Sequence, residues 1–199
     1  MRSFYSDKGH DDSFWISMRD RFDEYEVQTL LISVDNEGHL GDKDNKLRKK
    51  AIENHYKGIH KATIMYCHSV RFNAFWTADS SILKASLIHV LTRLTTYAAK
   101  EDINILSENH CLLSSDAQFI TSIIKVINLP NLDTLPDFGN LCLSAEWGST
   151  EDESYIKMYD PYLGLEIMLP YAKGVGTKAY NFNQTEYILI LNMRECFFC

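Results

Sequence analysis

The sequence predicts a single α+β domain with helices in its first half and β-strands in its second. Apolar residues recur at helical spacing as far as residue 128, whereas after residue 139 short apolar runs are separated by Gly, Pro and Asn. The chain has 199 residues, of which 45% are apolar and 24% charged, so it can bury one substantial core. We therefore expect one domain over residues 1–199, with a helical part over 1–60 and a functional core over 61–199.

Two helices are expected in the helical part. The first begins at Asp12 or Ser13 and has one broad apolar face, made of Phe14, Trp15, Met18, Phe22 and Tyr25. A turn-rich loop over residues 35–42 follows it. The second helix, over residues 43–57, is polar and basic, and its Lys and Arg residues form a solvated face.

Two further helices are expected between residues 79 and 128. Asp79 is a suitable N-cap for a long helix that ends at Ala99 and carries a leucine-rich stripe. Ser115 and Gln118 have the spacing of a capping box, which predicts a helix from there to Asn128.

The β-strands are expected mainly in the last third of the chain. One earlier strand is predicted over Ala62 to His68, where Thr63, Ile64, Met65 and Tyr66 follow one another without a helix breaker. Residues 129–139 contain two prolines and a terminal glycine, so we expect a loop there. The later predicted strands are Asn140 to Ser144, Gly164 to Leu169, Lys178 to Asn181 and Glu186 to Phe198.

Charge and cysteine content exclude several classes of function. The net charge of −7 would repel nucleic acid and anionic lipid, and no apolar stretch reaches the roughly 20 residues of a membrane span. The first residues do not resemble a cleavable secretion signal. Five scattered cysteines predict free thiols and a reducing compartment. Cys196 and Cys199 fit the last core strand better than a zinc ligand pair or a prenylation box.

Three segments together resemble the mono-ADP-ribosyltransferase superfamily. They are the strand ending at His68-Ser69-Val70, the stretch from Asp137 to Trp147, and the last strand, which opens as Gln184-Thr185-Glu186-Tyr187. The resemblance implies a helical N-terminal half packed on a split antiparallel β core of the ADP-ribosyltransferase type. It also implies a mono-ADP-ribosyltransferase that moves ADP-ribose from NAD to a protein side chain.

The resemblance implies roles for six residues. Glu186 would be the catalytic carboxylate that stabilises the oxocarbenium-like ribose, and Gln184, on the same face of the strand, would orient the incoming nucleophile. Either His68 or Arg71 would hold NAD. Ser144 and Tyr155 would contact its nicotinamide half. No metal is implied.

The same resemblance implies a small bacterial toxin or effector acting in a host cytosol, with a host protein as acceptor and a monomeric state. Two alternatives stay open from the residues themselves. One is a non-catalytic protein-binding module with an aromatic-rich surface, such as a decayed transferase or an immunity protein. The other is a hydrolase with a nucleophilic thiol at Cys67 or Cys111.

Overall fold

A parallel β-sheet forms the centre of the computed structural model, which describes residues 11–74, 79–143 and 157–177. The sheet has four strands in the order β1-β2-β3-β4, and each neighbouring pair is parallel. These strands are β1 (Leu31–Val34), β2 (Ser69–Asn73), β3 (Asn104–Glu108) and β4 (Leu132–Leu135). Strand order therefore follows chain order, as it does in a barrel of successive β–α units.

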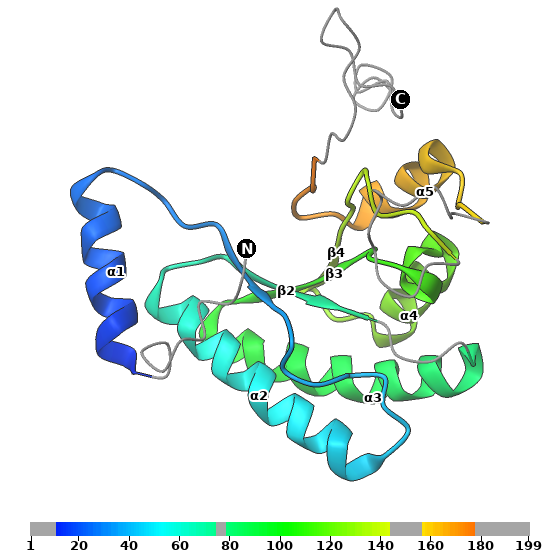
Figure 1. Cartoon of the computed structure of the whole chain (residues 1–199), viewed down its shortest axis with the longest axis horizontal. Helices are drawn as coiled ribbons and strands as arrows, with labels where there is room; N and C mark the ends of the chain where they lie inside the picture. Colours follow the sequence, from blue (N-terminus) through cyan, green and yellow to red (C-terminus); the bar gives the residue numbers. More distant parts are fainter. Residues whose placement is uncertain (1–10, 75–78, 144–156, 178–199) are drawn as a thin grey trace, which may run out of the picture.

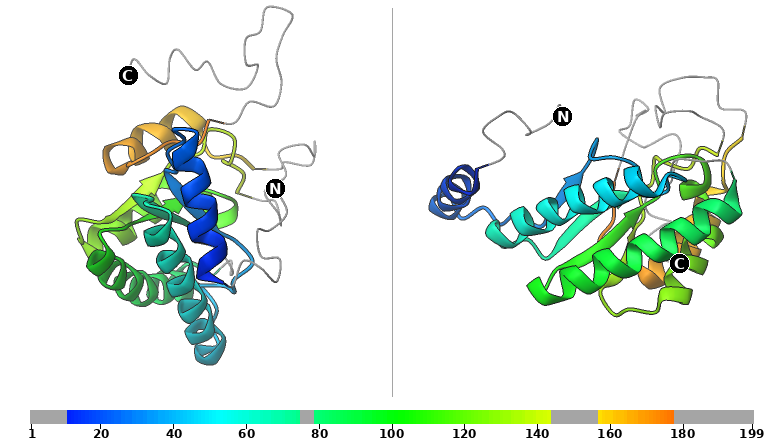
Figure 2. Two further views of the ribbon diagram at one scale, coloured as in Figure 1. Left: turned by 90° about the vertical axis from the view of Figure 1, so that its left-hand side faces the viewer. Right: turned by 90° about the horizontal axis from the view of Figure 1, so that it is seen from below.

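Helices connect the strands. The helix α1 (Asp12–Glu24) precedes β1, and the helices that follow the four strands in turn are α2 (Asn45–Ile64), α3 (Ser80–Ala98), α4 (Ala117–Ile127) and α5 (Pro161–Met168). Short 3₁₀ helices occupy Ala99–Glu101, Leu112–Ser115 and Leu169–Tyr171. Figure 1 shows α2 and α3 side by side beneath the sheet, and the right-hand view of Figure 2 shows them in front of it. One face of the sheet is thus covered by helices.

The helix-covered face of the sheet is apolar. Its side chains Val34, Val70, Phe72, Ile105 and Leu132 are at most 3% exposed and share one core with the buried residues of α2 and α3. Because side chains two apart on a strand point to the same face, the residues between them lie on the opposite, inner face.

Helix α2 packs very closely on β1. A Cβ atom added at Gly58 would lie only 2.5 Å from Cγ2 of Val34, a separation that real side chains do not tolerate. Glycine at this position therefore sets how near the helix can lie to the sheet.

The predicted split antiparallel β core is wrong. Parallel neighbours need a crossover of a dozen or more residues, and the helices supply that crossover. Residues 62–64 of the predicted strand instead end α2, residues 65–68 form the turn that follows it, and β2 starts only at Ser69. The β-branched Ile64 packs against the core from the last turn of the helix, where burial outweighs its preference for strands.

Two further strand predictions and one loop prediction are also wrong. Residues 164–168 belong to α5, which starts with Pro161 at its first position and Asp160 as N-cap. The predicted loop over 129–139 contains β4, because its prolines flank the strand without interrupting it. In the described part of residues 140–144 there is a single β-bridge, from Cys142 to Met158. The predicted strands over 178–181 and 186–198 lie outside the described residues.

The helix predictions agree better with the structure. α1 starts at Asp12, and Asp79 caps α3 with hydrogen bonds of 3.0 and 3.1 Å from the backbone N–H groups of Ser81 and Ile82. The helix predicted from Ser115 starts at Ala117, with Asp116 as its N-cap. α2 runs seven residues beyond its predicted end, to Ile64.

The β–α order continues after α5. Residues 172–176 lie parallel to the end of β4, with bridges from Thr134 to Ala172 and from Asp137 to Gly176. The N–H of Gly176 donates to the Pro136 carbonyl at 2.7 Å, and that of Phe138 donates to the Gly176 carbonyl at 2.9 Å. This segment therefore takes the place of the next strand. Within the described residues, no helix is long and apolar enough to cross a lipid bilayer.

Candidate functional site

The inner face of the sheet carries polar and charged side chains near the carboxyl ends of the strands. Arg71 and Asn73 lie on β2, Glu108 is the last residue of β3, and Asp35 directly follows β1. In parallel α/β proteins the carboxyl ends of the strands meet at one edge, where ligands bind. This edge is therefore the candidate site.

One guanidinium joins two carboxylates at this edge. Nη1 of Arg71 lies 2.5 Å from Oδ1 of Asp35, and its Nε lies 2.6 Å from Oε2 of Glu108. The side chains of Arg71 and Glu108 are 13% and 5% exposed, whereas that of Asp35 is 46% exposed. We call these three residues the Asp35–Arg71–Glu108 cluster. Its Glu108 end is buried, so that charge depends on Arg71, while its Asp35 end faces solvent.

Two amides extend the cluster. Nδ2 of Asn73 donates to Oδ1 of Asp35 at 3.0 Å, and Nδ2 of Asn140 donates to Oε1 of Glu108 at 3.2 Å. Both oxygens of Glu108 are therefore engaged. The other polar atom of Asn73, Oδ1, is buried and has no hydrogen-bond partner among the residues that the structure describes.

Asn109 ties together the two loops that border the cluster. Its Nδ2 donates to the backbone carbonyls of Asp137 and Asn140 at 2.9 and 3.0 Å, and its Oδ1 accepts from the N–H of Asp137 at 2.6 Å. Ser115 also donates to the Asn140 carbonyl, at 2.8 Å. These bonds hold Asn140 where its amide reaches Glu108.

A second acidic group lies deeper on the inner face. Asp133 of β4 is in register with Leu106, which is itself in register with Arg71, so all three share one row. Burial raises the pKa of Asp133, and Lys173, whose Nζ lies 3.6 Å from Oδ2, opposes that rise. A carboxyl group with a raised pKa is better suited to exchange protons near neutral pH.

Two of the six predicted site residues lie within the described part of the chain, one just before β2 and the other within it. His68 precedes β2 at the amino end of the sheet, where its Nδ1 lies 2.6 Å from Oγ of Ser69 and its carbonyl accepts from Asn104. Arg71 lies towards the carboxyl end, in the cluster. The four remaining predicted site residues, Ser144, Tyr155, Gln184 and Glu186, lie outside the described residues.

Sequence reasoning missed Asp35, Asn73, Glu108 and Asn140. A signal for two of them was present, because short, mostly apolar runs end at Asp35 and at Glu108, whereas Arg71 interrupts the segment that ends at Asn73. Only the parallel pairing of those runs reveals that their ends share one edge. For Asn140 we find no comparable signal in the sequence.

The thiols do not support a hydrolase. Burial raises the pKa of Cys67, whereas a nucleophilic thiol needs a lowered pKa. Sγ of Cys111 lies 3.7 Å from Nδ1 of His110, but Cys111 is fully buried, so a substrate could not reach its thiol.

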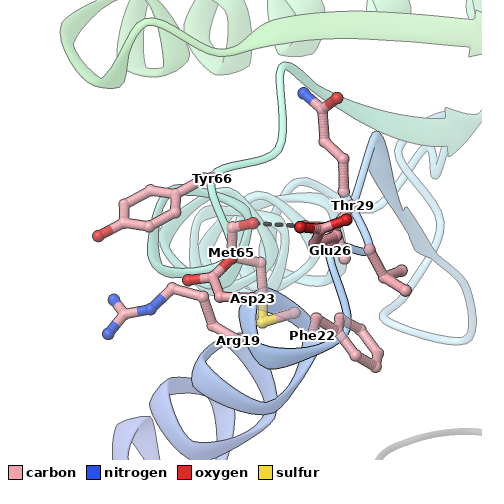
Figure 3. A pocket seen from close by; sticks show the side chains of 9 residues that line it. Arg19, Phe22, Asp23, Glu26, Thr29, Met65 and Tyr66 are labelled. Atoms are coloured by element: carbon pink, nitrogen blue, oxygen red, sulfur yellow. Dashed lines mark hydrogen bonds between the residues drawn. The ribbon is translucent and has the colours of Figure 1, made fainter.

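A hollow of about 330 Å³ lies at the opposite, amino end of the sheet, between α1 and the turn that follows α2 (Figure 3). The guanidinium of Arg19 stacks on the ring of Tyr66 at 5.0 Å and also pairs with Asp20. At its floor, Thr29 donates to the carbonyl of Met65. The length of the strands, about 3.3 Å per residue, separates this hollow from the cluster.

No protein-family model matches the sequence, and no curated protein matches it. Solved structures do match. They include a xylose isomerase domain protein from Planctomyces limnophilus, with 18% identity and a TM-score of 0.65 over 83% of this chain and 59% of that one. An L-ribulose 3-epimerase has 12% identity and a TM-score of 0.70 over 91% of this chain and 61% of that one.

A third match is a xylose isomerase-like TIM barrel protein from Mycobacterium smegmatis, in complex with magnesium. It has 16% identity and a TM-score of 0.68 over 94% of this chain and 67% of that one. The chain thus spans about three fifths of the length of the first two proteins.

These matches overturn the resemblance to ADP-ribosyltransferases. The neighbours are sugar isomerase and epimerase structures with parallel strands, so the predicted transferase activity, the use of NAD and the toxin or effector role are wrong. The alternatives of a non-catalytic module and a cysteine hydrolase gain no support from them either. At these identities the likeness concerns the fold alone, and the fold is that of xylose isomerase-like α/β barrels.

Proposed function

We propose that the protein binds a sugar and acts as a sugar epimerase or isomerase at the carboxyl ends of its strands. The observation that carries the proposal is the Asp35–Arg71–Glu108 cluster on the inner face of a sheet with this fold. Structures that share the fold include a D-psicose 3-epimerase and an L-ribulose 3-epimerase. Because the chain spans only part of those proteins, their activity supports the proposal without establishing it.

The side chains at this edge suit a polyhydroxylated ligand. A sugar hydroxyl can donate one hydrogen bond and accept two, so it pairs with groups of both kinds. The carboxylate of Asp35 accepts and is nearly half exposed, while the guanidinium of Arg71 donates. Charge-assisted bonds of this kind are stronger than neutral ones, which helps a small polar ligand compete with water.

The proposed reaction moves a proton on a carbon next to the sugar carbonyl. A base takes the proton, the C–H electron pair becomes the double bond of an enediolate, and the carbonyl oxygen takes the negative charge. Return of a proton to the same carbon from the opposite side gives the epimer, and return to the neighbouring carbon gives the isomer. Arg71 would stabilise the oxygen, and Asp133, whose pKa is raised by burial, would take the proton and return it on its own side of the sugar. In the epimerisation, a water molecule on the opposite side would supply the returning proton.

The described residues do not fit a divalent metal, although one neighbour was solved with magnesium. Magnesium prefers carboxylate oxygens in octahedral geometry, but here the positive guanidinium of Arg71 already contacts both Asp35 and Glu108. Residues 11–74, 79–143 and 157–177 contain no group of three or more His, Cys, Asp or Glu side chains placed to hold a metal ion. No step is therefore assigned to a metal.

Proton exchange tests the proposal directly. The full chain is incubated in D₂O with D-fructose, D-psicose, D-tagatose or L-ribulose, and proton NMR follows the loss of the signals next to the carbonyl. We expect exchange with at least one of these ketoses. Arg71→Ala should abolish it, because both the oxyanion donor and the order of the cluster are lost.

Arg93→Ala is the matched control, since Arg93 is exposed on α3. It should exchange protons as the wild type does. Absence of both exchange and binding for all four ketoses in the wild type would reject the proposed function.

The expectations of a monomer and of no nucleic-acid partner remain part of this proposal. They rest on the net charge of −7 and on the size of the chain. Light scattering of the purified chain, with and without duplex DNA, tests them. The expectations of a host protein acceptor and of secretion into a host cell depended on transferase activity and are not retained.

A further inference from the structure

We infer that Asn73 is a specificity-determining residue of the sugar site, whose side-chain oxygen accepts a hydrogen bond from one particular hydroxyl of the sugar. This inference rests on the proposed function. The observation behind it is that Oδ1 of Asn73 is buried and has no hydrogen-bond partner among the described residues.

The backbone and one hydrogen bond fix where this oxygen lies. Asn73 is the last residue of β2 and is in register with Glu108, the last residue of β3. It shares the inner face with Arg71, two residues earlier on the same strand. Because its Nδ2 is held by Asp35 at 3.0 Å, the amide cannot rotate to give Oδ1 a new partner without losing that bond.

A buried acceptor without a partner is uncommon, because folded proteins satisfy nearly all their buried polar groups. Two acidic oxygens on the inner face, Oε2 of Glu108 and Oδ2 of Asp133, are paired with the cations of Arg71 and Lys173. Two further buried atoms without a hydrogen-bond partner among the described residues, Oγ1 of Thr95 and Oγ of Ser107, lie on α3 and on the helix-facing side of β3. A ligand at the carboxyl edge cannot reach them. Asn73 differs, because its free acceptor belongs to the edge where we propose that the sugar binds.

The chemistry around Asn73 selects the group that would complete it. The neighbouring Asp35 and Glu108 carboxylates can only accept hydrogen bonds, and Arg71 donates to both of them. Oδ1 of Asn73 is also an acceptor, so a ligand atom placed against it must be a donor. A sugar hydroxyl is such a donor, and a sugar that lacks it would leave Oδ1 buried without a partner, which is how a hydrogen-bonding site rejects a deoxy analogue.

A double-mutant cycle between protein and ligand tests this assignment. Isothermal titration calorimetry measures the affinity of wild type and Asn73→Ala for the ketohexose that the wild type binds best, and for each of its monodeoxy analogues. For one analogue the wild type should lose affinity about tenfold. Asn73→Ala should lose about the same factor with the parent sugar and nothing further with that analogue.

Two further variants guard the interpretation. Asn73→Ser keeps a short acceptor and should recover part of the affinity for the parent sugar, which a purely structural role for Asn73 does not predict. Asn54→Ala is the matched control, because Asn54 lies on the outer helix α2, where its amide donates to the carbonyl of Glu37. It should bind every analogue as the wild type does.

The outcomes separate this inference from the proposed function. If the wild type binds the ketohexose but Asn73→Ala binds it equally well, the inference is wrong and the proposed function stands. The inference would also be wrong if Asn73→Ala lost affinity by the same factor for the parent sugar and for every monodeoxy analogue. If the wild type binds no ketohexose, both fall.

Discussion

The two faces of strand β2 are stabilised by different interactions: apolar packing on one face and ion pairs on the other. Phe72 is 1% exposed and packs in the core beneath the helices, whereas its neighbour Arg71 lies on the inner face between two carboxylates. The helix-covered face gains stability from apolar burial, and apolar side chains of similar size and shape can replace one another there. The inner face depends on charges that must be matched. Substitutions on the first face should therefore change stability alone, and those on the second should change stability and ligand binding together.

Arg71→Ala should have the largest effect. It leaves Glu108 buried without its ion partner, and breaking a buried pair costs about 3–5 kcal/mol. Urea unfolding should show this loss, and sugar binding should disappear with it. A double variant, Arg71→Met with Glu108→Leu, removes both charges and should regain most of the stability without regaining binding. A double variant no more stable than Arg71→Ala would show that the unpaired charge is not the cause.

Phe72→Ala should destabilise the protein almost as much as Arg71→Ala but should leave sugar binding unchanged. Removing a buried phenylalanine leaves a cavity and costs about 3–5 kcal/mol. Sugar affinity, measured well below the unfolding midpoint, should stay within about twofold of the wild type, because a twofold change is only a few tenths of a kcal/mol. Ile82→Ala, at a side chain 42% exposed on α3, is the control and should change little. A large loss of affinity in Phe72→Ala would contradict the separation of the two faces.

His55, on the core side of α2, should make stability depend on pH. Burial lowers the pKa of His55 to about 4, from 6.5, while its Nδ1 bonds to the Ala51 carbonyl. The unfolded chain therefore binds the proton more tightly, so the contribution is present above pH 6.5 and is lost as the pH falls towards 4. The loss should be roughly 3 kcal/mol.

Urea unfolding at pH 7.5 and pH 4.5 measures this dependence. His55→Phe removes the titrating group, so the difference in the free energy of unfolding between the two pH values should be smaller in this variant than in the wild type. An identical difference between the two pH values in wild type and variant would contradict the role of His55.

Gly58→Ala should destabilise the protein by about 1–3 kcal/mol, as overpacking a tight core does. In an open helix the same change would be stabilising by up to about 1 kcal/mol. The added methyl group would collide with Val34 of β1. Thermal unfolding measures the loss, and adding Val34→Ala should restore part of it. If the single variant is stabilised, α2 can move away from the sheet and the close approach is not required.

Asp133→Asn should give the smallest change in stability, and of opposite sign. Burial raises the folded-state pKa of Asp133 above its ordinary value of 3.8, so folding favours the protonated form. That contribution is present below pH 3.8 and is lost as the pH rises through the folded pKa. Asparagine needs no proton, so the variant should be slightly more stable at pH 7, with a gain that shrinks towards pH 4. Ketose proton exchange should fall in the same variant, and unchanged exchange would remove Asp133 from the proposed reaction.

The helices could be predicted from local sequence, because their signals are local. Asp79 precedes a long apolar stripe, and the helix begins where its carboxylate meets the first free N–H groups. In α1, the apolar residues on the same face as the buried Trp15 recur at helical spacing, so this helix could also be predicted. Such signals need no knowledge of the rest of the fold.

The sheet could not be predicted in the same way. Its strands have only four or five residues, and the run around Ile64 looks like a strand more than β2 does, because Arg71 and Asn73 interrupt the apolar pattern of β2. Those interruptions belong to the inner face and can be interpreted only once the pairing is known. The site shows the same limit, since Asp35 and Glu108 are 73 residues apart in sequence and meet only through Arg71.

The three hydrogen bonds of Asn109 couple the loop after β3 to the loop after β4. A backbone shift near Asp137, caused by an insertion or a strained residue, would move the amide of Asn109 and with it the loop after β3. Such a shift would also reach Glu108 through the amide of Asn140. We expect the two loops to open as one cooperative unit, with similar amide hydrogen-exchange rates. Variation that tunes which ligand fits this edge is then easier outside the loops than within them.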